Sequence, residues 1–213
     1  ERGVLADEPG LGKTNQAILA AEGRTLVVVP AVLLVNWQRE LAEWRAPGQE
    51  FTLTTYSRLC KRGERNTVSP VLRPEWQGRW GTGIFYECHA LRNRQANWTK
   101  AALKLKSERT YLLSGTPLAG WAWDVWPLLR LVNPGDDFAR SFWRWADHWF
   151  KSWEPPYRKG RELTGLRDGF PWEDFAQGTG LAERWLRRTM DEVLTELPPL
   201  TREVLEVELQ GEQ

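Results

Sequence analysis

The sequence contains little cysteine, no long apolar run and no excess of charge of either sign. Two cysteines, Cys60 and Cys88, are too few for a disulfide scaffold or a Cys-rich zinc site. The longest largely apolar run, residues 26–35, includes Pro30 and is too short to span a membrane. The 29 Lys and Arg residues balance the 28 Asp and Glu residues, which argues against a globally basic nucleic-acid binder and leaves local basic faces open.

The start of the sequence has no signal peptide, so we expect a protein of the cytoplasm or the nucleoid without a membrane segment. The chain begins at Glu1 and its only methionine is Met190, which indicates a piece of a longer protein. With 213 residues, 41% of them hydrophobic, it can bury the core of one large domain, or of one domain with an appendage. Tryptophan is abundant, with 14 residues, and seven of these lie between Trp121 and Trp153.

Strand-like and helix-like segments alternate along the chain. Residues 25–29 form a continuous apolar, β-branched run ended by Pro30, which is typical of a strand buried on both faces. We expect further strands at 2–6, 51–56, 83–86, 109–113 and 201–209, helices at 13–21, 35–44, 96–105, 138–153 and 181–194, and loops at 60–80 and 153–180. The alternation predicts an α/β fold with a mainly parallel sheet flanked by helices and a C-terminal helical extension.

A glycine-containing loop lies between the first predicted strand and the first predicted helix, and it consists of Asp7, Glu8, Pro9, Gly10, Leu11, Gly12, Lys13 and Thr14. Small residues let backbone N–H groups converge on phosphate oxygens, and the start of a helix favours the same anion. Lys13 is expected to reach the β- and γ-phosphates, and Thr14 to hold Mg²⁺ through its hydroxyl. The general pattern has Gly in place of Asp7, and Pro9 removes one N–H donor. An ordinary Gly-rich turn is the alternative.

A second acidic motif, residues 84–89, ends another predicted strand. Nucleotide hydrolases place an Asp there to hold Mg²⁺, followed by a Glu that orients the attacking water. Glu87 and His89 fit that pattern as catalytic residues. Tyr86 does not, because a phenol stays protonated at neutral pH and is a poor Mg²⁺ ligand. A degenerate ATPase, an inactivating change, and a single-base Asp-to-Tyr change or sequence error remain open.

Several segments in order resemble motifs of the Swi/Snf-family ATPases, the double-stranded-DNA translocases of helicase superfamily 2. They are residues 5–14, 25–40, 55–59, 86–89, 113–118 and 186–199. Asp7 is normal for the family, whereas Pro9 stands where Met is usual. The segment 86–89 occupies the DEAH-type box with its Asp replaced by Tyr86. The match covers nearly the whole chain.

The resemblance implies a RecA-like P-loop NTPase lobe at residues 1–135, a helical, Trp-rich extension closing it at 136–200, and the start of a connection to a second RecA-like lobe at 201–213. It implies ATP and Mg²⁺ as cofactors, with catalytic roles for Lys13, Glu87 and His89. It also implies that Ser114, Gly115 and Thr116 couple nucleotide state to DNA contact. Hydrolysis in the family needs an arginine finger from the second lobe, so we expect this chain alone to hydrolyse ATP negligibly.

Double-stranded DNA is the partner that the resemblance implies. Candidate phosphate contacts are the basic residues Arg58, Lys61, Arg62, Arg92 and Arg94, for which a solvated surface is the alternative. A different function also stays open: a non-hydrolysing DNA-binding or scaffold module derived from such a motor.

Other residues have competing interpretations. Phe142, Trp145, Trp149 and Trp153 recur at helical spacing, which favours core packing over base stacking. No catalytic base accompanies Cys88 in the sequence, so we do not expect a thiol nucleophile.

Two further expectations concern residues beside the proposed nucleotide site. His89 is expected to link the nucleotide site to residues 114–116 rather than to bind a metal. Arg187 and Arg188 are expected to contact a second lobe or to cap a helix C-terminus.

Overall fold

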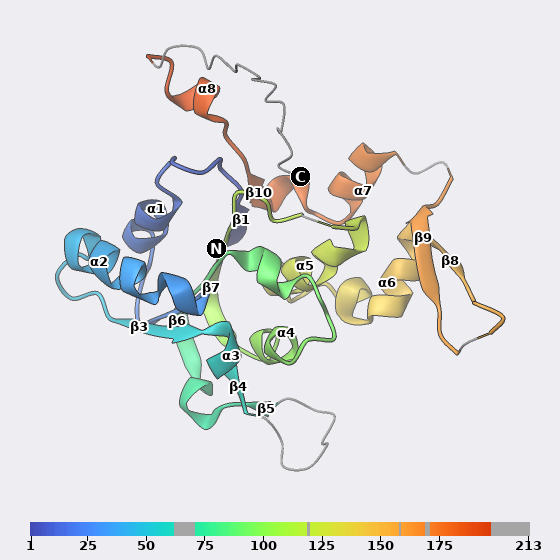
Figure 1. Cartoon of the computed structure of the whole chain (residues 1–213), viewed down its shortest axis with the longest axis horizontal. Helices are drawn as coiled ribbons and strands as arrows, with labels where there is room; N and C mark the ends of the chain where they lie inside the picture. Colours follow the sequence, from blue (N-terminus) through green and yellow to red (C-terminus); the bar gives the residue numbers. More distant parts are fainter. Residues whose placement is uncertain (62–70, 119, 158, 169–170, 197–213) are drawn as a thin grey trace, which may run out of the picture.

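A parallel sheet of six strands forms the centre of the chain in the computed structural model, which describes residues 1–61, 71–118, 120–157, 159–168 and 171–196 (Figure 1). The strand order is β10-β1-β7-β6-β2-β3, and every neighbouring pair is parallel. The strands are β1 (Arg2–Leu5), β2 (Thr25–Val29), β3 (Phe51–Thr55), β6 (Arg79–Tyr86), β7 (Lys106–Leu113) and β10 (Trp185–Leu186). The predicted α/β fold with a mainly parallel sheet is confirmed.

Helices cover both faces of this sheet (Figure 1). One face packs against α1 (Lys13–Leu19) and α2 (Leu34–Trp44), and the other against α3 (Tyr56–Leu59), α4 (Asn97–Ala102) and α5 (Trp126–Val132). Strand β2 shows why its sequence is uninterrupted. Leu26 and Val28 enter one core, while Val27 and Val29 enter the other, and all four are fully buried.

A separate aromatic core follows the sheet in sequence. It is built around α6 (Phe142–Trp149), the antiparallel hairpin of β8 (Phe150–Trp153) and β9 (Glu162–Leu166), and α7 (Trp172–Gly178). Trp145 and Trp149 are 1% and 6% exposed and contact Phe175. Core packing of these two tryptophans is therefore confirmed. Trp153 differs, since it lies on β8 and is 52% exposed.

Three sequence predictions about elements were wrong. The helix predicted at 138–153 is a 3-10 turn, α6 and then strand β8, because the chain becomes extended at the buried Phe150. The connection predicted at 153–180 contains β9 and α7. The helix predicted at 181–194 contains a 3-10 turn, strand β10 and the short helix α8 (Met190–Val193), because β10 pairs with β1.

The remaining differences are smaller. The loop predicted at 60–80 holds a two-stranded ladder of β4 (Cys60–Lys61) and β5 (Val71–Leu72) and the start of β6. The strand predicted at 201–209 lies outside the described residues. No helix in the described part of the chain is long and apolar enough to cross a membrane.

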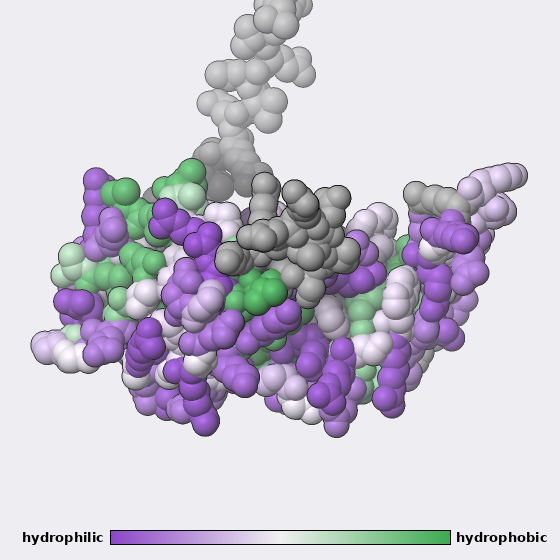
Figure 2. Space-filling view, turned by 90° about the horizontal axis from the view of Figure 1, so that it is seen from below, coloured by the Kyte–Doolittle hydropathy of each residue, from purple (hydrophilic) through white to green (hydrophobic). Residues whose placement is uncertain are grey.

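The surface is mixed in character. Figure 2 shows a mainly hydrophilic face, with hydrophobic surface gathered at the end of the molecule where α1 and α2 lie. Exposed apolar side chains on these elements and on the turn before α2 include Leu19, Val32 and Val35. The two helices therefore bury one stripe against the sheet and leave apolar groups outside.

Gly81 of β6 is predicted to be intolerant of a side chain. A Cβ atom there would collide with the backbone oxygen of Glu22 and lie 2.9 Å from Cα of Gly23. Gly81→Ala should lower the free energy of unfolding by about 1–3 kcal/mol, because two backbone segments would have to move apart. Urea denaturation measures this, with Gly135→Ala as the control, because nothing lies within 4 Å of its Cβ position. Equal stability of the two variants would contradict the prediction.

Candidate functional site

The phosphate loop, residues 7–14, is a compact turn between β1 and α1 at the carboxyl end of the sheet. Gly10 and Gly12 adopt φ angles of 92° and 70°, which side-chain-bearing residues rarely adopt. Leu11 N–H donates to the carbonyl of Glu8 over 3.4 Å, which closes the turn. The strand–turn–helix arrangement expected for an anion-binding loop is present.

Lys13 lies inside this turn. Its ammonium group donates to the carbonyl oxygens of Asp7 at 2.6 Å and Glu8 at 2.9 Å, and its side chain is buried. Burial lowers the pKa of Lys13, while the carboxylates of Asp7 and Glu87 act in the opposite direction. The cation is therefore held at the loop by neutral carbonyl groups, which leaves its charge available to an anion.

A buried ion pair joins the loop to a segment 181 residues later. The Asp7 carboxylate, which is 0% exposed, accepts hydrogen bonds from the backbone N–H of Arg188 at 2.9 Å and from its guanidinium group. The same guanidinium donates to Gln16 of α1 at 2.7 Å. Arg188 thus links the loop, the first helix and the chain that follows β10.

Backbone contacts continue this link. Ala6 N–H donates to Leu186 at 2.7 Å and Glu8 N–H donates to Arg188 at 3.0 Å. Arg187 donates to the carbonyls of Ala6 at 3.0 Å and Gly115 at 3.2 Å. This link between the loop and the chain after β10 was not predicted, because both arginines fall within the helix expected at 181–194. A signal for it is Asp7 itself, which stands in a loop position where the general pattern has Gly.

The acidic motif and the segment after β7 meet beside the loop. Ser114 donates to the Glu87 carboxylate at 2.9 Å, and Nδ1 of His89 lies 3.1 Å from both Glu87 and Ser114. Thr116 N–H donates to the Ser114 hydroxyl at 3.2 Å. The geometry therefore brings together residues that sequence analysis named separately, and it places His89 next to Ser114 as expected.

The backbone of Glu87 is strained. It has φ 54°, the only positive value at a non-glycine among the described residues. Such a conformation costs of order 1–3 kcal/mol and persists only where surrounding contacts hold it. Gly115 lies close to the loop as well, because a Cβ there would be 3.2 Å from Cδ of Pro9. The acidic motif, residues 114–116 and the phosphate loop are in direct contact.

Tyr86 stands where a carboxylate ligand of a magnesium ion is expected. The phenol of Tyr86 lies close to Thr14, the residue expected to hold the ion, and its ring packs edge-on against Trp37 with ring centroids 5.4 Å apart. Burial raises the pKa of Tyr86, the hydrogen bond to Thr14 opposes this, and the charge of Glu87 adds to it. The phenol is therefore neutral at pH 7. Within the described residues, no three His, Cys, Asp or Glu side chains cluster to hold a metal.

Cys88 and the predicted DNA contacts lie in different surroundings. Burial raises the pKa of the Cys88 thiol far above neutral pH, which is consistent with an inert side chain. Arg58 on α3 and Arg92 after the acidic motif are exposed. Arg94 is half-buried against aromatic rings. Lys61 is in β4 and its side chain is not described, while Arg62 lies outside the described residues.

The sheet and the phosphate loop define the class of the protein as a RecA-like P-loop lobe. A family model described as the SNF2-related domain matches residues 1–58 and 48–213. The chain belongs to the SNF2-related domain family, as its motifs had indicated.

Two curated relatives and one solved structure give the extent of the match. Helicase SWR1 of Cryptococcus neoformans var. neoformans serotype D (strain B-3501A) is 31% identical over 231 residues, covering 92% of this chain and 18% of that protein. Helicase ssl-1 of Caenorhabditis elegans is 28% identical over 247 residues, covering 99% of this chain and 10% of that protein. The chain spans less than one fifth of these relatives. The Sulfolobus solfataricus SWI2/SNF2 ATPase core in complex with dsDNA superposes with a TM-score of 0.69 at 23% identity, covering 92% of this chain and 42% of that chain.

The ion pair between Asp7 and Arg188 predicts a large loss of stability on removal of one partner. Arg188→Gln should lower the free energy of unfolding at pH 7 by about 2–4 kcal/mol, because the Asp7 carboxylate would stay buried without its cation. The value lies below that for a fully buried pair because the Arg188 side chain is 39% exposed. Urea unfolding followed by tryptophan fluorescence measures the change.

The same variant has a predicted pH dependence. Burial acts to raise the pKa of Asp7, but hydrogen bonds and charge from Arg188 outweigh it, so the pKa is lowered on folding. The stabilisation is present above the pKa of Asp7 in the unfolded chain and is lost as pH falls through the folded-state value. The gap between wild type and Arg188→Gln should therefore close in acid. Arg140→Gln, which breaks an exposed pair with Asp137, is the control, and an equal loss in both variants would contradict the assignment.

Proposed function

We propose that this chain is the ATP-binding lobe of a Swi/Snf-type, DNA-dependent ATPase that moves on duplex DNA or protein–DNA complexes. Family membership supports the ATPase assignment. The observation that carries the nucleotide site is the contact of three motifs: Lys13 inside the phosphate loop, Glu87 bonded to Ser114, and Gly115 packed on Pro9. A second RecA-like lobe, which the family uses to complete the catalytic site, is part of the proposal.

Each motif has a role in this proposal. The Lys13 ammonium and the amides at the start of α1 bind the triphosphate, because a cation and a helix N-terminus both favour an anion. Glu87 orients the attacking water after it exchanges its hydrogen bond from Ser114 for one from water. Release of that bond frees Ser114 and, through it, the backbone at Thr116. A change at the nucleotide would reach residues 114–116 by this route.

We propose that nucleotide binding at this site depends less on Mg²⁺ than it does in the family. Mg²⁺ prefers carboxylate, hydroxyl and water oxygens in a strict octahedral arrangement. The neutral phenol of Tyr86 lies beside Thr14 where the family has a carboxylate. We therefore assign the wild-type site to nucleotide binding with little help from metal. A non-hydrolysing module remains the alternative function, and Tyr86 is the observation in its favour.

Nucleotide binding tests the proposal. By isothermal titration calorimetry, ATP should bind the wild-type chain with nearly the same affinity with and without Mg²⁺. Lys13→Ala should weaken binding by about tenfold or more, because a charge-assisted contact to phosphate is lost. Tyr86→Asp should make binding Mg²⁺-dependent and about tenfold tighter when the ion is present, since a carboxylate ligand is restored.

Tyr86→Phe is the matched control for this experiment, because it removes the hydroxyl without supplying a carboxylate and should gain no Mg²⁺ dependence. If Mg²⁺ leaves the affinity of Tyr86→Asp unchanged, the acidic box is misassigned. If neither wild type nor Tyr86→Asp binds ATP, the chain is the scaffold of the alternative function.

Duplex DNA binding is a separate prediction, supported by the solved Sulfolobus core that contains dsDNA. The logarithm of the binding constant for a short duplex should fall linearly with the logarithm of salt concentration. Arg58→Gln should reduce the slope by about 0.9, the contribution of one phosphate contact. Arg45→Gln, at the exposed end of α2, is the control and should leave the slope unchanged. If the binding constant of the wild type did not change with salt concentration, duplex DNA would be excluded as a partner.

A further inference from the structure

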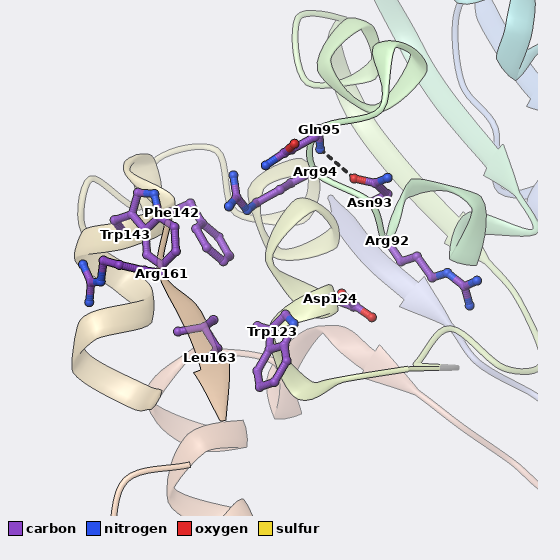
Figure 3. A pocket seen from close by; sticks show the side chains of 10 residues that line it. All are labelled: Arg92, Asn93, Arg94, Gln95, Trp123, Asp124, Phe142, Trp143, Arg161 and Leu163. Carbon is purple, nitrogen blue, oxygen red and sulfur yellow. Dashed lines mark hydrogen bonds between the residues drawn. The ribbon is translucent and has the colours of Figure 1, made fainter. Parts of the chain in front are cut away.

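A polar pocket lies outside the proposed nucleotide site. It is formed between the loop after the acidic motif and the aromatic extension, the part of the chain that contains α6, the β8–β9 hairpin and α7. It has a volume of about 290 Å³, and its lining includes Arg94, Trp123, Phe142, Trp143 and Arg161 (Figure 3). In Figure 3 the side chains of Arg94, Phe142 and Trp143 lie on one side of the hollow, and that of Trp123 lies across it. None of its lining residues belongs to the phosphate loop.

Arg94 is the unusual residue of this pocket. Its guanidinium carbon lies 3.8 Å from the ring centroid of Phe142 and 5.3 Å from that of Trp143. Within the described residues, its guanidinium group has no hydrogen bond and no carboxylate partner, although the residue is half-buried. Partial burial of a cation without an anion is unfavourable, and desolvation lowers the pKa of Arg94 accordingly. The ring faces stabilise the guanidinium plane and leave its N–H edge free for an anion.

The second arginine of the pocket shows the contrast. Arg161 also stacks on Trp143, at 4.8 Å, but it is paired with the Asp147 carboxylate and donates to Ser152 at 2.8 Å. Its charge is therefore compensated by the protein itself. Arg94 is the position at which an anionic group from a ligand would gain most.

The other wall of the pocket offers aromatic surface. Trp123 lines the pocket, and Trp121, which does not line it and is 64% exposed, stacks on Trp123 with ring centroids 5.0 Å apart and planes 10° from parallel. Asn93 and Gln95, both exposed, add amide groups to the rim. Aromatic planes, amides and an unpaired arginine are the groups that bind a base and its phosphate in unpaired strands.

We propose that this pocket binds a nucleotide of a single-stranded nucleic acid, with its phosphate on Arg94 and its base against Trp123. The volume lies just below the ~300–1,000 Å³ of typical small-ligand pockets, which suits one nucleotide and not a base-paired duplex. An acidic peptide would satisfy Arg94 but would make no use of the stacked indoles. This inference does not rest on ATP or on duplex binding.

The experiment is fluorescence anisotropy with the full 213-residue chain and a fluorescein-labelled dT12 strand. Wild type should bind in a salt-dependent manner, and Arg94→Gln should weaken binding about tenfold and reduce the log–log salt slope by about 0.7. Trp123→Ala should weaken it about fivefold or more, since stacking contributes about 1–3 kcal/mol per base. Arg45→Gln is the charge-matched control and should bind as wild type.

Three outcomes would overturn the assignment. The first is wild type that does not bind dT12 at low salt. The second is an equal loss in Arg94→Gln and Arg45→Gln, which would mean non-specific charge attraction. The third is competition by a poly-glutamate peptide at lower concentration than by unlabelled dT12, which would make the occupant an acidic peptide. Unfolding curves of Arg94→Gln and Trp123→Ala, and Arg94→Lys as a variant that keeps the charge, separate lost binding from lost folding.

Discussion

The buried pair of Asp7 and Arg188 is the interaction on which the rest of the site depends. A carboxylate with no exposed surface needs both charge and hydrogen-bond compensation, and the backbone and guanidinium of one residue supply them together. Because that residue follows β10, the pair also fixes the strand that borders β1. The phosphate loop therefore has its shape only when the C-terminal part of the chain is in place.

Two residues beside the phosphate loop, Glu87 and Tyr86, depart from the usual pattern. Glu87 has a positive φ, and its carboxylate accepts a hydrogen bond from Ser114 and lies 3.1 Å from Nδ1 of His89. Tyr86 directly before it occupies the place of an acid, beside Thr14. A neutral phenol lowers the negative charge close to the Lys13 ammonium. The site is thereby biased towards attracting an anion and away from attracting a cation.

Most of the sheet was predictable because each strand carries its own signal. Strand β2 is apolar from Leu26 to Val29 and fully buried. The helices predicted at 13–21 and 35–44 each follow a turn at the end of a strand, so the local sequence pattern and the fold agree. The C-terminal third was not predictable, since residues 181–194 contain helix-forming residues but are drawn into the sheet edge by pairing with β1. The Asp7–Arg188 contact, with 181 residues between its members, has no local signature at all. The phosphate loop could be predicted because all of its residues are adjacent in the sequence.

The aromatic extension is bound to the lobe at more than one place. Trp185, at its end, packs against both the sheet core and the aromatic core, and two residues later the chain reaches the phosphate loop. At its other edge, Arg94 from the loop after the acidic motif stacks on Phe142 of α6. Only η3 (Cys88–Leu91) and Arg92 and Asn93 separate Arg94 from Glu87. A rigid shift of the extension would therefore act on Asp7 and Glu87 together, so the extension is structurally coupled to the phosphate loop and the acidic motif.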